Sequence, residues 1–204
     1  ETFWATGDYE LPVPDVAITL LEDFRRDPDA AALTTPSGKI EIFSQTIESF
    51  GYDDCPPHPA WLEPVEWLGS AKAKDFPLHL VSNQPRTRLH SQYDNGGYAQ
   101  ASKVQGREPV VIHPEDAAAR GIEDGAIVRV FNDRGACLAG AVISDAVQRS
   151  VIQLPTGAWY DPVEPGGLDA HGNPNVLTLD KGTSKLAQGP SAHSALVEVK
   201  KFEG

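Results

Sequence analysis

The chain has 204 residues and a formal net charge of −12, with 17 basic and 29 acidic residues. This acidic balance argues against a protein that binds nucleic acid or an anionic membrane surface. Hydrophobic residues make up 40% of the chain, enough for a real core, and no stretch reaches the roughly 18 apolar residues of a membrane span.

The charge is unevenly distributed along the chain. Residues 1–71 carry three basic and fourteen acidic residues, whereas residues 72–107 carry six basic and two acidic ones. A basic island in an acidic chain suits one small anionic ligand. Cys55 and Cys137 lie far apart in unlike contexts, which favours two reduced thiols over a disulfide or a metal pair. Because the chain has no methionine, we expect it to be a piece of a longer protein.

Residues 1–75 are predicted to form an arm with little core of its own. Its first 15 residues favour a loop, and Asp15 can cap a short helix that carries Leu20 and Phe24 on one face. A turn at Pro36–Gly38 is followed by a predicted strand with Ile40 and Ile42 on one side. Ser44 can cap a helical turn that ends at Gly51. The arm's large apolar residues need a surface elsewhere to bury against: Phe3, Trp4, Trp61 and Trp67.

From Pro77 onward the pattern is that of a mainly β fold with short helices. Short runs of strand character occupy residues 77–82, 108–113, 126–131, 136–143, 150–154 and 195–202. A helix is predicted at 115–120, because Pro114 suits the first position and Gly121 follows the end. Five to seven short strands with one or two small helices predict a compact β-barrel.

Two long polar segments interrupt this barrel, at about 83–107 and 156–192. The donors of the first include Arg88, His90, Ser91 and Gln92, and the second contains Asn175 and Gln188. Arginine suits a phosphate or carboxylate, and amide groups suit the edge of a heterocycle. Such long loops in a compact domain are commonly binding loops, although a solvated loop paired with the acidic arm is the alternative for the first.

The second segment has its own alternatives. A small helix opening at Thr183 or Ser184 could present backbone N–H groups to an anion, and ordinary turn chemistry is the other interpretation. The histidines of the chain show no metal-ligand spacing, so no metal site is predicted, and no residue pattern identifies a catalytic group.

Several motifs in order resemble one family. These are "SNQPRTRLHSQYDNGG", "EPVVIHPEDAAARGI", "RVFNDRGACLAGAV", "GAWYDP", "HGNPNVLT" and "GTSKLAQG", preceded by "TPSGKIEIFS" and "GYDDCPPHPAWLEP". Together they resemble the C-terminal end of the molybdopterin-dependent S- and N-oxide reductases, which include the dimethyl sulfoxide, trimethylamine N-oxide and biotin sulfoxide reductases. The first and third motifs look most like the biotin sulfoxide reductases.

The resemblance implies a six-stranded double-psi β-barrel over residues 76–204, preceded by residues 1–75, which would belong to the body of a larger enzyme. It implies that this barrel helps to bury a molybdenum-bound bis(molybdopterin guanine dinucleotide). The residues expected to face this cofactor are Arg88, His90, Ser91, Gln92, Asn175 and Gln188. The family's metal-ligating serine would lie upstream of residue 1, so we expect the chain alone to lack the metal and the cofactor and to be inactive.

The resemblance further implies partners and a compartment. The expected partners are the remaining domains of the same enzyme and a separate electron donor, with no nucleic acid and no membrane insertion. The expected compartment is the cytoplasm, with the periplasm as the alternative. A stand-alone barrel, acting as a protein-interaction module or a small self-processing enzyme, is the alternative function. Self-processing barrels need a Gly-Ser cleavage site, and here Gly69-Ser70 precedes the barrel.

Overall fold

The computed structural model describes residues 2–204, which fall into two units. The first unit comprises the residues up to 51 together with 56–59, and the second comprises 52–55 together with 60–204. The expected boundary after residue 75 therefore falls inside the second unit. No helix among the described residues is long and apolar enough to cross a membrane.

The first unit consists of loops and three short helices: α1 (Thr2–Thr6), α2 (Glu22–Arg26) and α3 (Gln45–Ser49). The prediction for α3 is confirmed, since the Ser44 side chain accepts a hydrogen bond from Ile47 N and Gly51 follows with φ 63°. The predicted helix capped by Asp15 is wrong, because α2 begins only at residue 22. The β-branched residues Val16, Ile18 and Thr19 between them disfavour a helix.

The predicted strand around Ile40 and Ile42 is also wrong. In its described part the first unit contains no strand, so these residues have no neighbour with which to form a ladder. Their side chains are exposed, as are most large apolar side chains of this unit, for example Trp4 at 87%. The expectation that the arm has little core of its own holds for the first unit.

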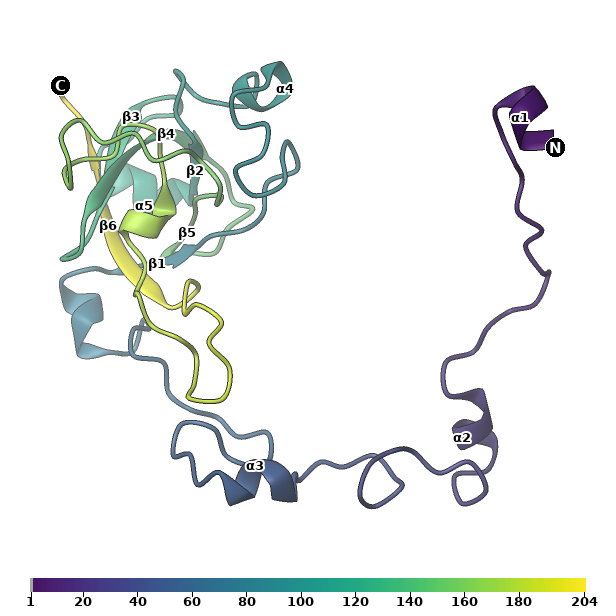
Figure 1. The fold of residues 1–204 in the computed structure, drawn as a ribbon. Helices are drawn as coiled ribbons and strands as arrows, with labels where there is room; N and C mark the ends of the chain where they lie inside the picture. The colour runs from purple at the N-terminus through teal and green to yellow at the C-terminus, as the bar shows by residue number, and fades with distance from the viewer. Residues whose placement is uncertain (1) are drawn as a thin grey trace. The chain divides into compact units, whose positions relative to one another are not determined.

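The second unit contains a closed six-stranded barrel (Figure 1). Its strands are β1 (Leu78–Val81), β2 (Pro109–Ile112), β3 (Ile127–Phe131), β4 (Ala136–Ile143), β5 (Val151–Gln153) and β6 (Ala195–Lys201). They are paired in the order β1-β5-β2-β4-β3-β6. The predicted strands are confirmed in this part of the chain. The barrel interior is filled by alternate strand residues, including Leu80, Val110, Val128, Ile152 and Val197, which are fully buried.

The pairing pattern repeats between the two halves of the barrel. Strand β1 is parallel to β5 and antiparallel to β6, and β4 is likewise parallel to β2 and antiparallel to β3. The remaining pairs, β2–β5 and β3–β6, are antiparallel and map onto themselves when the halves are exchanged. This twofold-symmetric pattern with two parallel pairs confirms the expected double-psi topology.

Short helices precede the first strand and occupy three of the connections between strands. They are η1 (Ala71–Lys74), α4 (Gly97–Gln100), α5 (Pro114–Ala118) and η2 (Pro174–Val176). The predicted helix at 115–120 is confirmed as α5. Pro114 takes the first position, His113 Nδ1 accepts from Glu115 N at 3.2 Å, and Gly121 turns the chain away with φ 61°.

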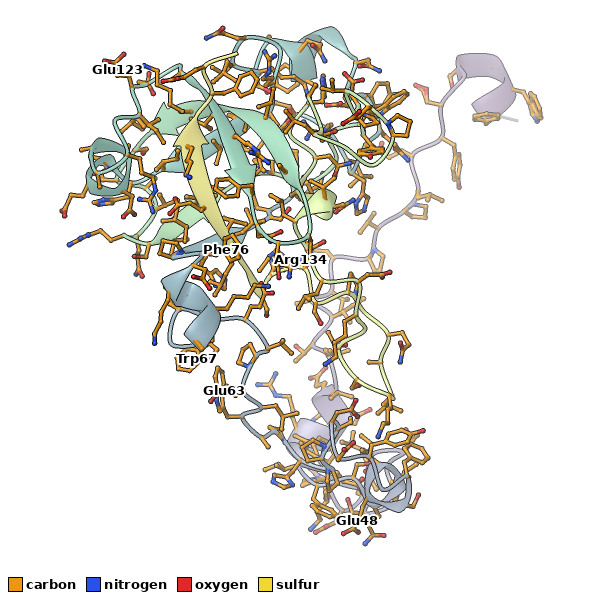
Figure 2. All side chains as sticks on the ribbon, turned by 90° about the vertical axis from the view of Figure 1, so that its left-hand side faces the viewer. Glu48, Glu63, Trp67, Phe76, Glu123 and Arg134 are labelled. Atoms are coloured by element: carbon orange, nitrogen blue, oxygen red, sulfur yellow. The ribbon has the colours of Figure 1, made fainter. Side chains whose placement is uncertain are left out.

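Residues 60–75 belong with the barrel because Glu66 is bound there. Its side chain is 2% exposed and accepts hydrogen bonds from Arg134 Nη1 at 2.5 Å, Arg134 Nη2 at 3.0 Å, Lys72 Nζ at 2.5 Å and Leu196 N at 2.8 Å. In Figure 2, Arg134 lies beside the segment that carries Trp67 and Phe76. Burial opposes the charge of Glu66, but these donors outweigh it and lower the pKa of Glu66 from 4.5 to about 2.

This shift links stability to acid pH. Because the pKa is lower in the folded than in the unfolded state, ionised Glu66 contributes stability above pH 4.5, and the contribution is lost as the pH falls towards about 2. Its size is roughly 3 kcal/mol. In Glu66→Gln we expect the free energy of unfolding at pH 7 to fall by about 3–5 kcal/mol, because Lys72 and Arg134 lose their carboxylate.

Urea denaturation at a series of pH values from 7 to 2 checks this prediction. The wild type should lose stability more steeply below pH 4.5 than Glu66→Gln does. Glu123→Gln, which changes an exposed carboxylate, is the matched control and should follow the wild type. Parallel curves for the wild type and Glu66→Gln would contradict the assignment.

Candidate functional site

The two long polar loops form one pocket. Its volume is about 410 Å³, and residues of the 83–107 and 156–192 segments line it together: His90, Ser91, Thr156, Gly157, Ala158, Trp159, Tyr160, Asn173 and Asn175. We call this the loop pocket. Its size lies in the range of small-molecule sites, roughly 300–1,000 Å³. Hydroxyl, amide, imidazole and indole groups dominate its lining.

Three of the residues predicted from the sequence meet in this pocket. His90 and Ser91 come from the first loop, and Asn175 comes from η2 in the second. Gln92 is in the first loop but does not line the pocket. Gln188 lies elsewhere, in a loop that closes on itself: its Nε2 donates to Ser184 O at 2.7 Å.

The structure of the Gln188 loop distinguishes the two interpretations of its sequence. Ordinary turn chemistry is confirmed and the small helix at Thr183 or Ser184 is not formed, because a bridge between Gly182 and Pro190 makes this segment a narrow loop. The Thr183 hydroxyl donates to Ala187 O at 2.8 Å, which satisfies the backbone without a helical turn.

Close backbone contacts shape the pocket wall where the two loops meet. His90 takes the left-handed conformation with φ 50°, and Gly157 packs against it with φ 92°. A Cβ atom on Gly157 would overlap the His90 carbonyl oxygen. The indole Nε1 of Trp159 donates to Ser91 O at 2.8 Å, which ties the second loop to the first.

A buried carboxylate organises the wall of the pocket that carries Asn173 and Asn175, which we call the asparagine side. Asp169 is fully buried, and its Oδ1 accepts from the backbone nitrogens of His171, Gly172 and Asn173 at 2.8–3.1 Å. Asn173 is 8% exposed and caps η2 by accepting from Asn175 N at 3.0 Å. Within residues 2–204 its side-chain nitrogen makes no hydrogen bond, so it is a free donor at the pocket wall.

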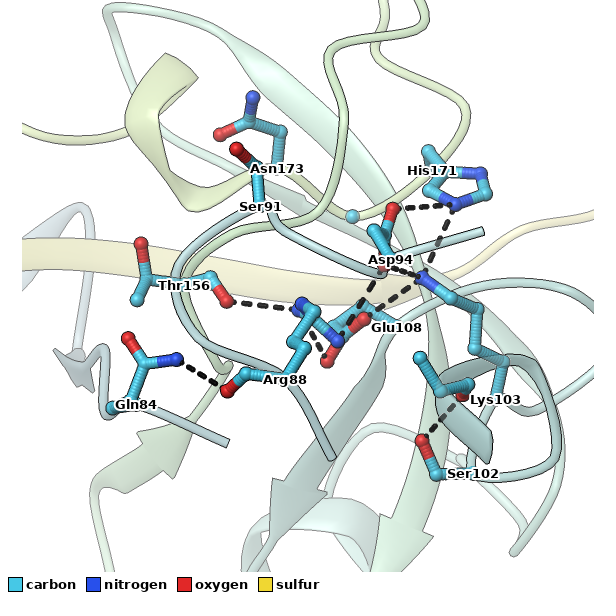
Figure 3. A network of polar contacts seen from close by, with 12 residues as sticks. Gln84, Arg88, Ser91, Asp94, Ser102, Lys103, Glu108, Thr156, His171 and Asn173 are labelled. Carbon is cyan, nitrogen blue, oxygen red and sulfur yellow. Dashed lines mark hydrogen bonds and ion pairs between the residues drawn. The ribbon is translucent and has the colours of Figure 1, made fainter. Parts of the chain in front are cut away.

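Beneath the first loop lies a cluster of four buried charges (Figure 3). The side chains of Arg88, Asp94 and Lys103 are 0% exposed, and that of Glu108 is 1% exposed. Lys103 Nζ lies 2.7 Å from Asp94 Oδ1 and 3.1 Å from Glu108 Oε2, and Arg88 Nη2 lies 3.0 Å from Glu108 Oε1. We call this set the charge cluster.

The charge cluster keeps the Asp94 carboxylate ionised. Burial raises the pKa of Asp94, but hydrogen bonds from Lys103 and Trp159 N, with the charges of Lys103 and Arg88, outweigh it and leave the pKa below its usual value. The Arg88 guanidinium is thus bonded to protein groups, and the expected contact between Arg88 and a ligand stays a prediction.

Several of the residues that line the pocket were not predicted as site residues from the sequence. Thr156, Trp159 and Tyr160 follow β5 directly, and Asn173 precedes η2. The sequence signal was the run Gly157-Ala-Trp-Tyr, which lies in a long loop and in the "GAWYDP" motif of the family resemblance, because binding residues are concentrated on loops. Among the described residues, no three His, Cys, Asp or Glu side chains are grouped so that they could hold a metal ion, and both cysteines are free.

Comparison with known proteins identifies the family. The model of the molydopterin dinucleotide binding domain matches residues 78–196, which include strands β1 to β5, the start of β6 and both loops of the pocket. The chain belongs to this family.

Homologous reductases match over the whole chain. It is 52% identical to a dimethyl sulfoxide/trimethylamine N-oxide reductase and 52% identical to a biotin sulfoxide reductase, both from Cereibacter sphaeroides. It is 50% identical to trimethylamine-N-oxide reductase 1 of Escherichia coli. All of this chain is covered in each comparison, but only 25–27% of the relative. The chain therefore spans about a quarter of the length of these relatives.

A solved structure supports the fold alone. Acetylene hydratase from Pelobacter acetylenicus matches with a TM-score of 0.70 and 23% identity, over 86% of this chain and 25% of the hydratase.

The loop pocket suits the ligand for which the molydopterin-binding family is named. Pterin and guanine share an edge of one amino group, one ring N–H and one carbonyl, and amide side chains complement such an edge. The free amide donor of Asn173 and the aromatic faces of Trp159 and Tyr160 supply this chemistry. The donor set therefore fits a pterin or a nucleotide, and the residues that could hold it are His90, Ser91, Asn173 and Asn175.

Replacement of Gly157 tests the loop contact. We expect Gly157→Ala to destabilise the fold by about 1–3 kcal/mol more than Gly166→Ala, because overpacking adds to the strain of a positive φ. Gly166 is the matched control, since it has φ 75° but open space around its Cα. Chemical denaturation of both variants measures the difference, and equal losses of stability would contradict the close contact with His90.

Proposed function

We propose that the loop pocket binds the pterin or nucleotide part of a molybdopterin dinucleotide. The observation that carries this proposal is the group of free amide, hydroxyl and aromatic side chains that two loops of a molydopterin-binding domain direct into one pocket. In this proposal Asn173 and Asn175 hydrogen-bond the heterocycle, and the Trp159 ring stacks on it. Stacking of a base on an aromatic side chain contributes about 1–3 kcal/mol.

Binding of guanosine 5′-monophosphate (GMP) to the 204-residue chain tests the proposal. We expect a Kd of about 1 mM, the affinity that a few hydrogen bonds and one stacked ring supply. Asn175→Ala should weaken GMP binding about three- to tenfold, since a neutral hydrogen bond is worth roughly 0.5–1.5 kcal/mol. Shifts of the tryptophan indole and asparagine amide resonances in an NMR titration measure both constants.

Two further variants locate the binding. Gln148→Ala changes an exposed amide outside the pocket and should bind GMP like the wild type. Gln188→Ala tests the contact predicted for the separate loop at 182–190. Unchanged affinity in Asn175→Ala, or binding of inorganic phosphate as tight as that of GMP, would refute recognition of the heterocycle by the loop pocket.

We further propose that the chain is the C-terminal part of a molybdenum enzyme that reduces S-oxides or N-oxides. In this proposal the cofactor is bis(molybdopterin guanine dinucleotide), the substrate is biotin sulfoxide and a separate protein supplies the electrons. The relatives named above support the reductase class. The chain is equally identical to a dimethyl sulfoxide/trimethylamine N-oxide reductase and to a biotin sulfoxide reductase, so overall identity does not rank the substrates. The choice of biotin sulfoxide rests on the resemblance of the motifs at 82–96 and 129–142 to the biotin sulfoxide reductases. The proposed compartment is the cytoplasm, on the same resemblance.

Steady-state kinetics of the full-length reductase rank the substrates. We expect kcat/KM for biotin sulfoxide to exceed that for dimethyl sulfoxide and trimethylamine N-oxide by at least tenfold, which corresponds to about 1.4 kcal/mol of transition-state discrimination. The same assay on the 204-residue chain is the control and should give no turnover, since the described residues group no metal ligands. A higher kcat/KM for trimethylamine N-oxide would reassign the substrate.

A further inference from the structure

We propose that Arg88 and Lys103 are positioning residues, which hold the walls of the loop pocket through the charge cluster and do not touch the ligand. This inference rests on the proposed function of the pocket. It differs from the direct contact expected for Arg88 from the sequence. Three properties of the cluster carry it: its burial, its charge balance and the groups to which it is bonded.

The burial and charge of the cluster explain why it does not need a ligand. Arg88 and Lys103 bring two positive charges, and Asp94 and Glu108 bring two negative ones, all with side chains at most 1% exposed. A buried charge is stable only when it is paired and hydrogen-bonded. Here each cation has an acidic partner inside the protein and the four charges sum to zero, so a phosphate would add an unbalanced negative charge.

The bonds that leave the cluster end on the pocket wall. Arg88 Nη2 donates to Thr156 O at 2.8 Å, and Arg88 Nε donates to His90 O at 3.2 Å. Asp94 Oδ2 accepts from Trp159 N at 3.1 Å. Thr156, His90 and Trp159 all line the pocket. The cluster thus fixes the backbone of three wall residues, from both loops.

A further contact extends the cluster to the asparagine side. Lys103 Nζ lies 3.1 Å from His171 Nε2, and His171 Nε2 lies 3.4 Å from Asp94 Oδ2. His171 belongs to the turn whose backbone nitrogens are held by Asp169 and which leads into Asn173. Both walls of the pocket are therefore attached to one set of charges (Figure 3).

Arg88 Nη1 is the one nitrogen of the guanidinium that could instead contact a ligand, and the experiment includes this outcome. Arg88 Nη1 is buried and makes no hydrogen bond within residues 2–204, with Asp94 Oδ1 at 3.5 Å as its ion-pair partner. A ligand phosphate that reached Nη1 would make Arg88 a binding residue. A phosphate contact and a positioning role predict different responses to removal of the phosphate from the ligand.

The experiment compares Arg88→Lys with Arg149→Lys in the 204-residue chain. Arg149 is exposed and pairs with exposed Glu115, so it is the matched control. Dissociation constants are measured for GMP and for guanosine, which has no phosphate. Hydrogen exchange of the ligand-free protein is followed by mass spectrometry in peptides that cover residues 88–92 and 156–160.

We expect Arg88→Lys to weaken GMP and guanosine by the same factor, about tenfold, a size typical when a group that orients a binding residue is lost. Amide exchange at 156–160 should also become faster without ligand. Weakened binding of GMP with unchanged binding of guanosine, or unchanged amide exchange in Arg88→Lys, would overturn the proposal. Lys103→Arg, which keeps the charge but changes its reach, gives the same readouts if Arg88→Lys does not fold.

The design separates this inference from the proposed function. If the wild type bound neither GMP nor guanosine, the proposed function would fail. The exchange of residues 156–160 in ligand-free protein would still decide whether the cluster positions the wall.

Discussion

Buried carboxylates hold three long irregular segments of the second unit on its barrel. Glu66 anchors residues 60–75, Asp94 and Glu108 anchor the first loop, and Asp169 anchors the second. Each is at most 2% exposed. A carboxylate removed from water must receive hydrogen bonds or cations, or it costs several kcal/mol. Each buried carboxylate therefore acts as an anchor, because the loop must adopt the one conformation that supplies these hydrogen bonds and cations.

These anchored carboxylates allow the loop pocket to form from segments that are neither helix nor strand. The loops that line it contain few backbone hydrogen bonds of helix or sheet type, and ordering such segments costs conformational entropy. Asp169 offsets part of this cost by accepting from four backbone nitrogens, those of Asp161, His171, Gly172 and Asn173. The pocket is therefore preorganised by charges that lie behind its wall, while its lining keeps free donors.

The barrel strands could be predicted because their signals are local. Alternation of apolar residues marks β1 to β6, and Pro114 with Gly121 delimits α5. The errors in the first unit have a common cause, since a pattern of alternating isoleucines at 40 and 42 specifies a strand only when a neighbouring strand exists. Residue type alone selected His90, Ser91 and Asn175, and the structure brings them together in the loop pocket, where their ligand contact stays a prediction.

The role of Arg88 was beyond local reasoning. Its partners Glu108 and Thr156 are 20 and 68 positions away, and only the closure of the barrel brings them together. From composition, an arginine in a basic island indicates an anionic ligand. The acids that neutralise it are two residues in the same region, Asp94 and Glu108, and the sequence alone does not show that they point inward. Three-dimensional pairing is thus needed to distinguish a ligand contact from a structural ion pair, and here it supports the positioning role proposed above.

The symmetry of the barrel shows which segments create the loop pocket. Exchange of the halves maps β1 onto β4 and β2 onto β5, yet the β1–β2 connection is the 82–108 segment, whereas the β4–β5 connection is only residues 144–150. Likewise the β5–β6 connection carries the aromatic and asparagine walls, and the equivalent β2–β3 connection is mainly the short helix α5. The strands repeat, but the pocket does not. The loop pocket is thus a property of two unequal loop insertions, and a closed barrel with fully paired strands provides the rigid base on which such insertions can diverge.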